Sequence, residues 1–137
     1  MKRILLALVG ILPLICSCSP VESNDSGVPK NLIGTWEAIK SESYSDWKKI
    51  YEDTFRAEEY QIVFDEYTYL EIEDGEIEWR SAYTYDKKKK RIVPAFGKVM
   101  VVDKLTASEL VLIFGDIGGD IGYEQGEFAK GTFIKLR

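Results

Sequence analysis

Short runs of alternating apolar and polar residues fill most of the chain after residue 30. Such alternation is typical of strands that face a core on one side and solvent on the other. Tight turns separate the runs, for example at Asp74-Gly75, a pair that favours a two-residue hairpin turn. The pattern predicts about eight strands, in residues 32–42, 59–65, 67–73, 76–86, 91–96, 98–105, 109–116 and 127–137.

One segment departs from this alternation. Between residues 45 and 59, apolar side chains recur at helical spacing, and charged residues lie between them. Ser45 is a suitable N-cap residue, and Asp46 falls in the first turn. We therefore predict one amphipathic helix of about three turns directly after the first strand. Its apolar residues would be Trp47, Ile50, Tyr51, Thr54 and Phe55.

The order of these elements limits the fold class. No second alternation of strand and helix follows, which argues against a parallel α/β sheet. Short connections and one polar face per strand favour an up-and-down barrel or a flattened sandwich. We predict an all-β fold, a small up-and-down antiparallel β-barrel of about eight strands with one short helix after the first strand. Of the 137 residues, 45% are hydrophobic, which suffices for one domain with an ordinary core.

The first 17 residues have a different pattern, that of a secretory signal peptide. A positively charged start precedes an apolar run, from residue 4 to residue 15, that is shorter than a membrane-spanning helix requires. Both cysteines of the chain, Cys16 and Cys18, lie at the end of this run. The rest of the chain therefore has no thiol for a disulfide, a nucleophile or a metal site.

The stretch Ile15-Cys16-Ser17-Cys18 resembles a bacterial lipobox, in which an aliphatic, a variable and a small residue precede the lipidated cysteine. The resemblance implies that Cys18 begins the mature chain and carries a diacylglycerol and an acylated amino terminus. Cys16 fits this role less well, because Ile15 would then occupy the small-residue position. An ordinary secreted protein with two incidental cysteines is the alternative. Ser19, which follows the anchor, favours the outer membrane and leaves open which face of it the domain occupies.

The segment after the anchor reads as a tether. Residues 19–30 contain Pro, Ser, Gly, Asn and Asp without a periodic apolar pattern. The predicted organisation is a lipoprotein signal peptide over residues 1–17, the lipidated cysteine and flexible tether over 18–30, and the barrel domain over 31–137. We therefore expect the protein in the cell envelope, attached to a membrane through Cys18.

Charge limits the partners of this chain. The formal net charge is −5, so no global basic field attracts nucleic acid, and nucleic acid is not expected as a partner. One basic run, KKKKR at residues 87–91, is interpreted as a solvated turn that discourages edge pairing. A patch for anionic lipid or polymer is the alternative. No pattern in the sequence identifies a protein partner.

Residues suited to catalysis or metal binding are few. The chain has no His, which removes the commonest general base and metal ligand. The acidic, glycine-rich stretch at residues 116–124 matches no EF-hand spacing, and we interpret it as a hairpin loop rather than a calcium site. The acidic residues between 71 and 78 are expected on the outer face of the barrel. Motifs for a nucleophile elbow, a phosphate loop or a dinucleotide are absent. We predict no enzymatic activity, no cofactor and no metal.

Gly34-Thr35-Trp36 opens the predicted domain and resembles the G-x-W signature of lipocalins and fatty-acid-binding proteins. The order of LIGTWEAI, YTYD, KLTASELVL and a closing basic-aliphatic strand, behind a lipobox, is similar to the small lipocalin-like domains of bacterial (Bacteroidetes-type) lipoproteins. The resemblance covers residues 31–137 and implies an eight-stranded barrel without an enzymatic reaction or an agreed ligand. In lipocalins an Arg from the last strand stacks over the Trp. Lys135 and Arg137 are the candidates here, and Arg137 is preferred because a guanidinium stacks better on an indole.

Alternation assigns an inward face to each predicted strand. A barrel of this size is just wide enough to be filled by its own side chains or to hold one small ligand. Trp36 is therefore either a plug or the floor of a cavity. The hydroxyl groups along the later strands are either polar handles for a ligand or half-buried groups in contact with water. The predicted inward residues are Trp36, Ala38, Ile62, Phe64, Leu70, Ile72, Ile77, Trp79, Tyr83, Tyr85, Val99, Val101, Leu110, Leu112, Phe114, Thr132, Ile134 and Leu136.

Two functions are compatible with this prediction. The first is a lipid-anchored lipocalin-like protein of the cell envelope that binds a small hydrophobic or amphipathic ligand in its barrel. The second is a non-catalytic envelope interaction or structural protein with a filled barrel. The candidate ligand-binding residues are Trp36, Phe64, Trp79, Ser81, Tyr83, Tyr85, Phe114 and Thr132. The predicted helix would lie over the barrel mouth as a lid or a fixed plug, through Trp47, Ile50, Tyr51 and Phe55.

Overall fold

The computed structural model of the chain describes residues 27–114 and 126–137, and most of these residues belong to one antiparallel β-sheet. Within these two ranges the only helical element is a single 3-10 turn. The elements are η1 (Lys30–Leu32), β1 (Gly34–Ser45), β2 (Lys48–Thr54), β3 (Tyr60–Phe64), β4 (Thr68–Glu73), β5 (Glu76–Asp86), β6 (Arg91–Pro94), β7 (Met100–Leu105), β8 (Glu109–Phe114) and β9 (Phe128–Lys135).

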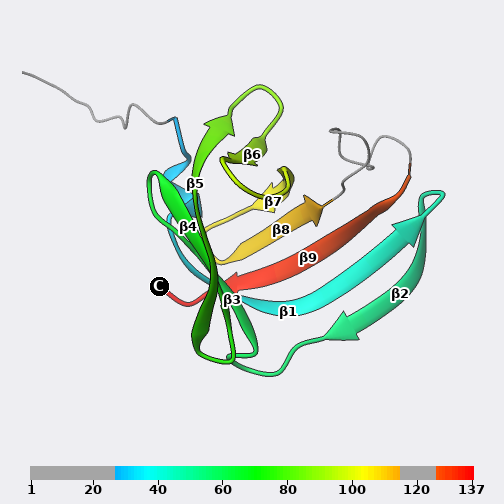
Figure 1. Cartoon of the computed structure of the whole chain (residues 1–137). Helices are drawn as coiled ribbons and strands as arrows, with labels where there is room; N and C mark the ends of the chain where they lie inside the picture. The colour runs from blue at the N-terminus through cyan, green and yellow to red at the C-terminus, as the bar shows by residue number, and fades with distance from the viewer. Residues whose placement is uncertain (1–26, 115–125) are drawn as a thin grey trace, which may run out of the picture.

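Eight of the nine strands, all except β2, close into a barrel (Figure 1). From β3 to β9, each strand pairs with the next one along the chain, and β9 then pairs with β1. The first half of β1 completes the ring through β3, from Gly34 opposite Phe64 to Glu37 opposite Gln61. The predicted all-β antiparallel barrel is therefore confirmed.

The remaining strand, β2, lies where the residue spacing predicted a helix, and the helix prediction is wrong. β2 forms a hairpin with the second half of β1, and Lys48 lies opposite Ser45. Asp46 and Trp47 both have positive φ angles, 53° and 64°, as a type I′ turn requires. All seven residues of β2 are exposed, so a helical apolar stripe would gain no burial here. Backbone pairing with β1 therefore stabilises this segment more than a helix with an exposed apolar stripe would.

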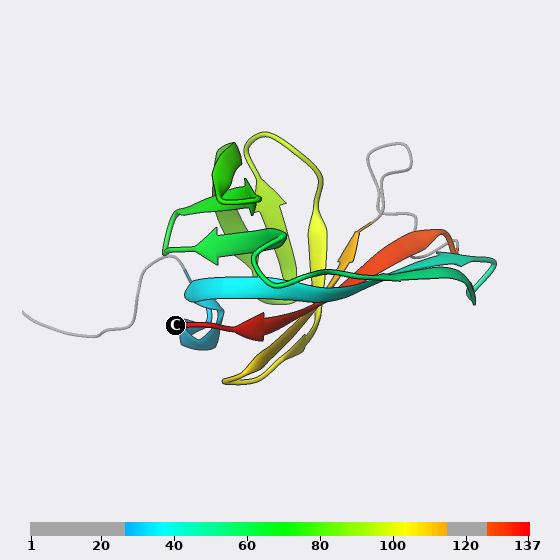
Figure 2. The ribbon, with the colours of Figure 1, turned by 90° about the horizontal axis from the view of Figure 1, so that it is seen from below.

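The hairpin and β9 extend together beyond the rest of the barrel (Figure 2). β1 has a bulge between Ala38 and Lys40, beside β9, and bulges bend a strand. Past this bulge, the residues of β1 and β9 that share the inner face with β8 are all small: Ser41, Ser43, Ala129 and Gly131. Small side chains leave this end of the barrel less filled than the other end.

The opposite end is packed solid around Trp36. Its side chain is completely buried, and the indole N–H donates to the Leu32 carbonyl oxygen at 2.9 Å. The core comprises Val28, Leu32, Trp36, Ala38, Ile62, Phe64, Tyr69, Tyr83, Ile92, Met100, Val102, Leu110, Leu112 and Phe133. At this end Trp36 therefore plugs the barrel.

The inward face of β4 is the opposite of the predicted one. Residues directly opposite in a ladder share a face. Tyr69 lies opposite Phe64, and Glu71 lies opposite Ile62, whose side chain is completely buried. Tyr69 and Glu71 therefore face inward, and the predicted Leu70 and Ile72 face outward.

The same error affects β7 and β9, because apolar residues occupy both faces of these strands and alternation cannot tell the faces apart. On β7, Met100 and Val102 belong to the core instead of Val101. On β9, Phe133 is the core residue, and its neighbours Thr132 and Ile134 face outward. Among the other predicted inward residues, Ile77 and Leu136 are exposed and Val99 is half-buried.

Candidate functional site

Four of the predicted ligand-binding residues belong to the packed interior. Trp36, Phe64, Ser81 and Tyr83 are each at most 4% exposed. Their polar atoms also have partners within the chain. The Ser81 hydroxyl donates to the Ala82 carbonyl at 2.7 Å and accepts the Phe96 N–H at 3.1 Å, and the Tyr83 hydroxyl donates to the Asp65 carbonyl. These residues hold the barrel together and do not present groups to a ligand.

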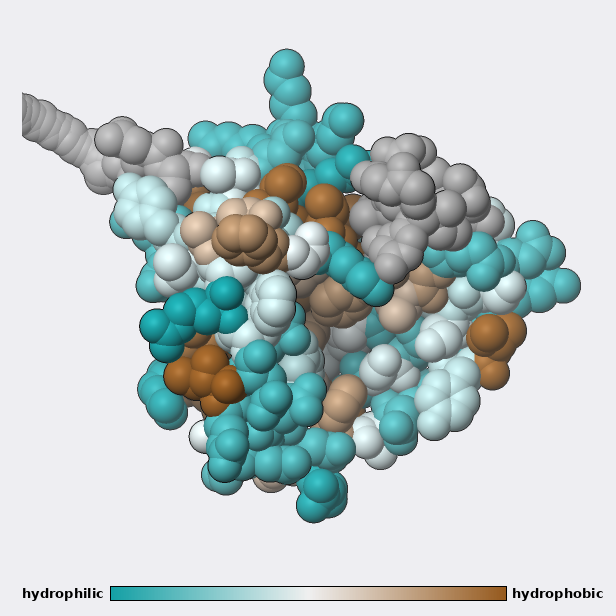
Figure 3. Space-filling view, viewed as in Figure 1, coloured by the Kyte–Doolittle hydropathy of each residue, from teal (hydrophilic) through white to brown (hydrophobic). Residues whose placement is uncertain are grey.

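A cleft opens instead at the less filled end of the barrel, with a volume of about 410 Å³. On the face shown in Figure 3, the surface has a recess near the centre with apolar atoms on its walls. Strands β3, β4 and β5 supply one side of the cleft, and β7, β8 and the β6–β7 loop supply the other. The lining residues are Tyr60, Tyr69, Glu71, Glu78, Trp79, Gly97, Lys98, Met100 and Phe114.

Two of these residues, Trp79 and Phe114, were predicted from the sequence. Trp79 lies opposite Glu71 and shares its inward face. A bulge in β5 adds one residue between Ile77 and Trp79, so that these two side chains point to opposite faces of the sheet. Trp79 faces inward, and Ile77 lies opposite the outward Ile72. The sequence gives no sign of this bulge. Tyr69, Glu71 and Met100 were missed because the faces of β4 and β7 were inverted, and Gly97 and Lys98 because the loop was not considered. Glu78 is the extra residue of the bulge, and Tyr60 was not assigned to the inward face.

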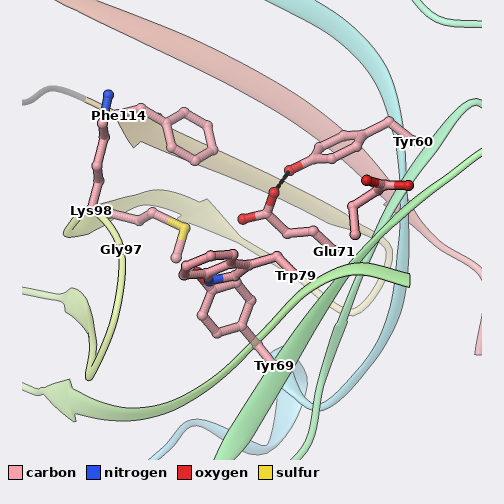
Figure 4. Close-up of a pocket in the computed structure, with 9 residues that line it drawn as sticks. Tyr60, Tyr69, Glu71, Trp79, Gly97, Lys98 and Phe114 are labelled. Atoms are coloured by element: carbon pink, nitrogen blue, oxygen red, sulfur yellow. Dashed lines mark hydrogen bonds between the residues drawn. The ribbon is translucent and has the colours of Figure 1, made fainter. Parts of the chain in front are cut away.

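The aromatic walls of the cleft are supported from behind by core rings. The Tyr69 ring stacks on Phe64 with centroids 5.8 Å apart, and the Tyr60 ring lies 6.2 Å from that of Phe133. In Figure 4, the Trp79 indole lies against Tyr69. Because the Tyr60 and Tyr69 rings are held by packing, this wall of the cleft is formed without a ligand.

A glycine allows the β6–β7 loop to close the base of the cleft. Gly97 has φ +116°, and a Cβ at this position would lie 3.3 Å from the Tyr69 hydroxyl oxygen and 3.6 Å from the Trp79 indole nitrogen. Any side chain would therefore strain the backbone and crowd the Tyr69 hydroxyl.

The carboxylate of Glu71 lies among the rings. The Tyr60 hydroxyl donates to Glu71 Oε1 at 3.0 Å (Figure 4). Burial, and then the negative charge of Glu71, raise the pKa of Tyr60 well above its ordinary value. The same two causes raise the pKa of Tyr69 to about 12. Both phenols therefore keep their protons at neutral pH and can act as hydrogen-bond donors.

The other two predicted ligand-binding residues lie elsewhere. Thr132 is buried on the outer face of β9, opposite Val111. Tyr85 lines a second, shallower cleft of about 520 Å³ at the other end of the barrel, together with Lys30, Lys87 and Lys90. Residues Lys87 to Lys90 form the exposed turn between β5 and β6, as interpreted from the sequence.

The predicted lid is also absent, since its residues are not in a helix. Trp47, Ile50 and Tyr51 lie on the β1–β2 hairpin with 54%, 66% and 61% of their surface exposed. Phe55, after β2, is half-buried and stacks on Tyr60 with centroids 6.0 Å apart. Of the four predicted lid residues, Phe55 is the one that supports a wall of the cleft.

A cation closes the Trp36 end of the barrel, as the sequence predicted, but it comes from Lys135. The Lys135 ammonium lies 5.0 Å from the centre of the Trp36 ring and donates to the Asn31 carbonyl at 2.9 Å. Arg137 contributes its main chain: its carbonyl accepts the Thr35 N–H at 2.7 Å. That carbonyl also fills the space where a side chain at Gly34 would lie, which explains the glycine before Thr35-Trp36.

Within residues 27–114 and 126–137, no group of three or more His, Cys, Asp or Glu side chains is placed to hold a metal ion. No helix in the described part of the chain is long and apolar enough to span a bilayer. The predicted signal peptide, Cys18, most of the tether and the acidic loop at 116–124 lie outside the described residues.

No protein-family model, no curated protein and no solved structure matches this chain significantly. The resemblance to lipocalin-like lipoproteins therefore stays a prediction from the sequence motifs, with which the closed barrel is compatible.

Proposed function

We propose that this chain is a lipid-anchored protein of the cell envelope whose lipocalin-like barrel binds one small hydrophobic or amphipathic molecule. The cleft beside Trp79 is the observation that supports this function. Its volume of about 410 Å³ falls within the range of about 300–1,000 Å³ typical of small-molecule sites. Four aromatic side chains line it, with a few polar groups between them.

The position of the cleft also supports binding. The core plugs the barrel at the Trp36 end, so a ligand enters only part of the interior and rests against Tyr69 and Met100, which belong to the core. Trp79 is 41% exposed at the mouth, and a bound apolar molecule would cover it. Burial of that surface is the driving force that we expect for binding.

Attachment to the membrane is proposed from the lipobox resemblance at Cys18. Two or more acyl chains on one cysteine would hold the protein firmly at a bilayer surface. The anchor would place the barrel where apolar and amphipathic molecules are concentrated.

Binding can be tested with the chain from Ser19 onward, because the strands and core described here all lie after residue 27. A neutral fluorescent probe, N-phenyl-1-naphthylamine, should bind saturably with one molecule per chain. Trp79→Ala should weaken binding about tenfold, since a large contact surface is lost. Trp47→Ala is the matched control, because Trp47 is also partly exposed but lies on the hairpin. Equal effects of the two substitutions, or no saturable binding, would contradict the proposal.

The β1–β2 hairpin favours the alternative function, a non-catalytic interaction protein. Trp47, Ile50 and Tyr51 expose apolar surface on a hairpin that projects from the barrel. Exposed apolar patches often mark contacts with other proteins. If the probe does not bind, this hairpin is the surface at which to search for a partner.

A further inference from the structure

The cleft contains an acid at a position where barrel interiors usually carry an apolar side chain. Glu71 faces inward between two inward-facing neighbours across the ladders, Ile62 on β3 and Trp79 on β5. It is half-buried, and Tyr60 holds its carboxylate in place with a hydrogen bond of 3.0 Å. A second acid, Glu78, lines the same cleft at the bulge of β5.

The ion pairs of the described chain do not neutralise these acids. Lys49 pairs with Glu42 and Glu52, and Lys104 pairs with Glu109. The ion pairs between described residues include neither Glu71 nor Glu78. Among the described lining residues Lys98 is the one with a basic side chain, and in Figure 4 it lies across the cleft from Glu71, beside Phe114.

The aromatic rings beside Glu71 favour a positively charged ligand, as the carboxylate itself does. The face of an aromatic ring carries negative potential and attracts a cation. Tyr60, Tyr69 and Trp79 all line the cleft around Glu71. A carboxylate among aromatic walls is therefore suited to an organic cation, and it repels a carboxylate ligand such as a fatty acid.

We infer that the cleft selects molecules in which a primary ammonium group is attached to an apolar or aromatic body. The ammonium would donate hydrogen bonds to Glu71, and the apolar body would lie against Trp79, Met100 and Phe114. This inference rests on the proposed function, since it names the ligand class of the same cleft.

Three ligands that share one ring but differ in charge test the inference. They are 2-phenylethylammonium, the neutral 2-phenylethanol and the anionic phenylacetate, titrated by calorimetry into the chain from Ser19 onward at neutral pH. We expect the ammonium compound to bind about tenfold tighter than the alcohol, and the anion to bind most weakly. In the neutral-probe assay described above, the ammonium compound should displace the dye, and fatty acids should not.

Two substitutions locate the charge selection. Glu71→Gln keeps an oxygen that can accept the Tyr60 hydrogen bond but removes the charge, so the ammonium should lose its advantage over the alcohol. Binding of the neutral probe should remain, which shows that the variant is folded. Glu76→Gln is the matched control, since Glu76 is an exposed residue at the start of β5 and does not line the cleft.

The failures of the two proposals are distinguishable. Equal affinities for the three ligands, tightest binding of the anion, or an unchanged preference in Glu71→Gln would overturn the cation inference while probe binding still supports a ligand site. If neither the three ligands nor the neutral probe bind, both proposals fail.

Discussion

At the scale of single residues, Gly34 and Trp36 have separate roles at the start of β1. Gly34 leaves room for the Arg137 carbonyl, so that the C-terminal residues can run beside the start of β1. Trp36 then fills the barrel below, with its N–H bonded to Leu32 and Lys135 over its ring. The motif closes one end of the barrel and does not touch the cleft.

Trp36→Ala should therefore lower stability strongly. Removing a fully buried Trp leaves a cavity and an unpaired Leu32 carbonyl, at a cost of about 3–5 kcal/mol. Urea unfolding followed by circular dichroism measures the loss. Ile50→Ala, at a site 66% exposed, should change the free energy of unfolding by no more than about 0.5 kcal/mol. A small effect of Trp36→Ala would show that Trp36 does not fill the core.

At the scale of elements, the sequence predicted the positions of the strands better than it predicted which face of each strand points into the barrel. Alternation located the strands of the barrel because one face of each is buried. It failed on β4, where the inward positions hold Tyr69 and Glu71 and the more apolar Leu70 and Ile72 face outward. It failed on β2, whose helical spacing is local and has no burial to support it. Bulges, such as that in β5, depend on the partner strand and leave no mark in one sequence.

The hairpin strand β2 should behave as an addition to the barrel rather than a part of its ring. Its backbone pairs with β1 alone among the described strands, and all of its residues are exposed. Amides in residues 48–54 should exchange with deuterium at least about tenfold faster than those of β3, which pairs on both sides. Mass spectrometry of peptic fragments measures this difference. Equal protection of both strands would mean that β2 is integral to the cooperative fold.

At the scale of the whole molecule, one end of the barrel is packed and the other is hollow. The sequence could indicate the packed end, because Trp36 and its motif are local. The hollow end results from long-range pairing, which places small residues of β1 and β9 and aromatic residues of β3, β4 and β5 on the inner face. Neither the ladder register nor the two strand bulges beside this end can be derived from one sequence. For this reason only Trp79 and Phe114 of the lining were predicted.

The stability of the whole fold should depend on the phenols of the cleft at high pH. The pKa of Tyr69 is raised in the folded state from 10.0 to about 12, and that of Tyr60 is raised as well. Between these two pH values the unfolded chain releases protons that the folded chain retains, so the free energy of unfolding falls as pH rises. Below pH 10 the two phenols should have no effect. In Tyr69→Phe, the fall measured by urea unfolding should be smaller; an identical fall would contradict the raised pKa.

Locating the site at which a ligand binds tests the proposed function most directly. The chain has three Trp residues, one in each setting: Trp36 in the packed core, Trp47 on the hairpin and Trp79 at the cleft. Their indole N–H signals can be followed separately by ¹H–¹⁵N NMR while N-phenyl-1-naphthylamine is added to the chain from Ser19 onward. We predict that the Trp79 signal shifts and saturates at one equivalent, while those of Trp36 and Trp47 stay in place. A shift confined to Trp47, or no shift at all, would contradict a ligand site in the cleft.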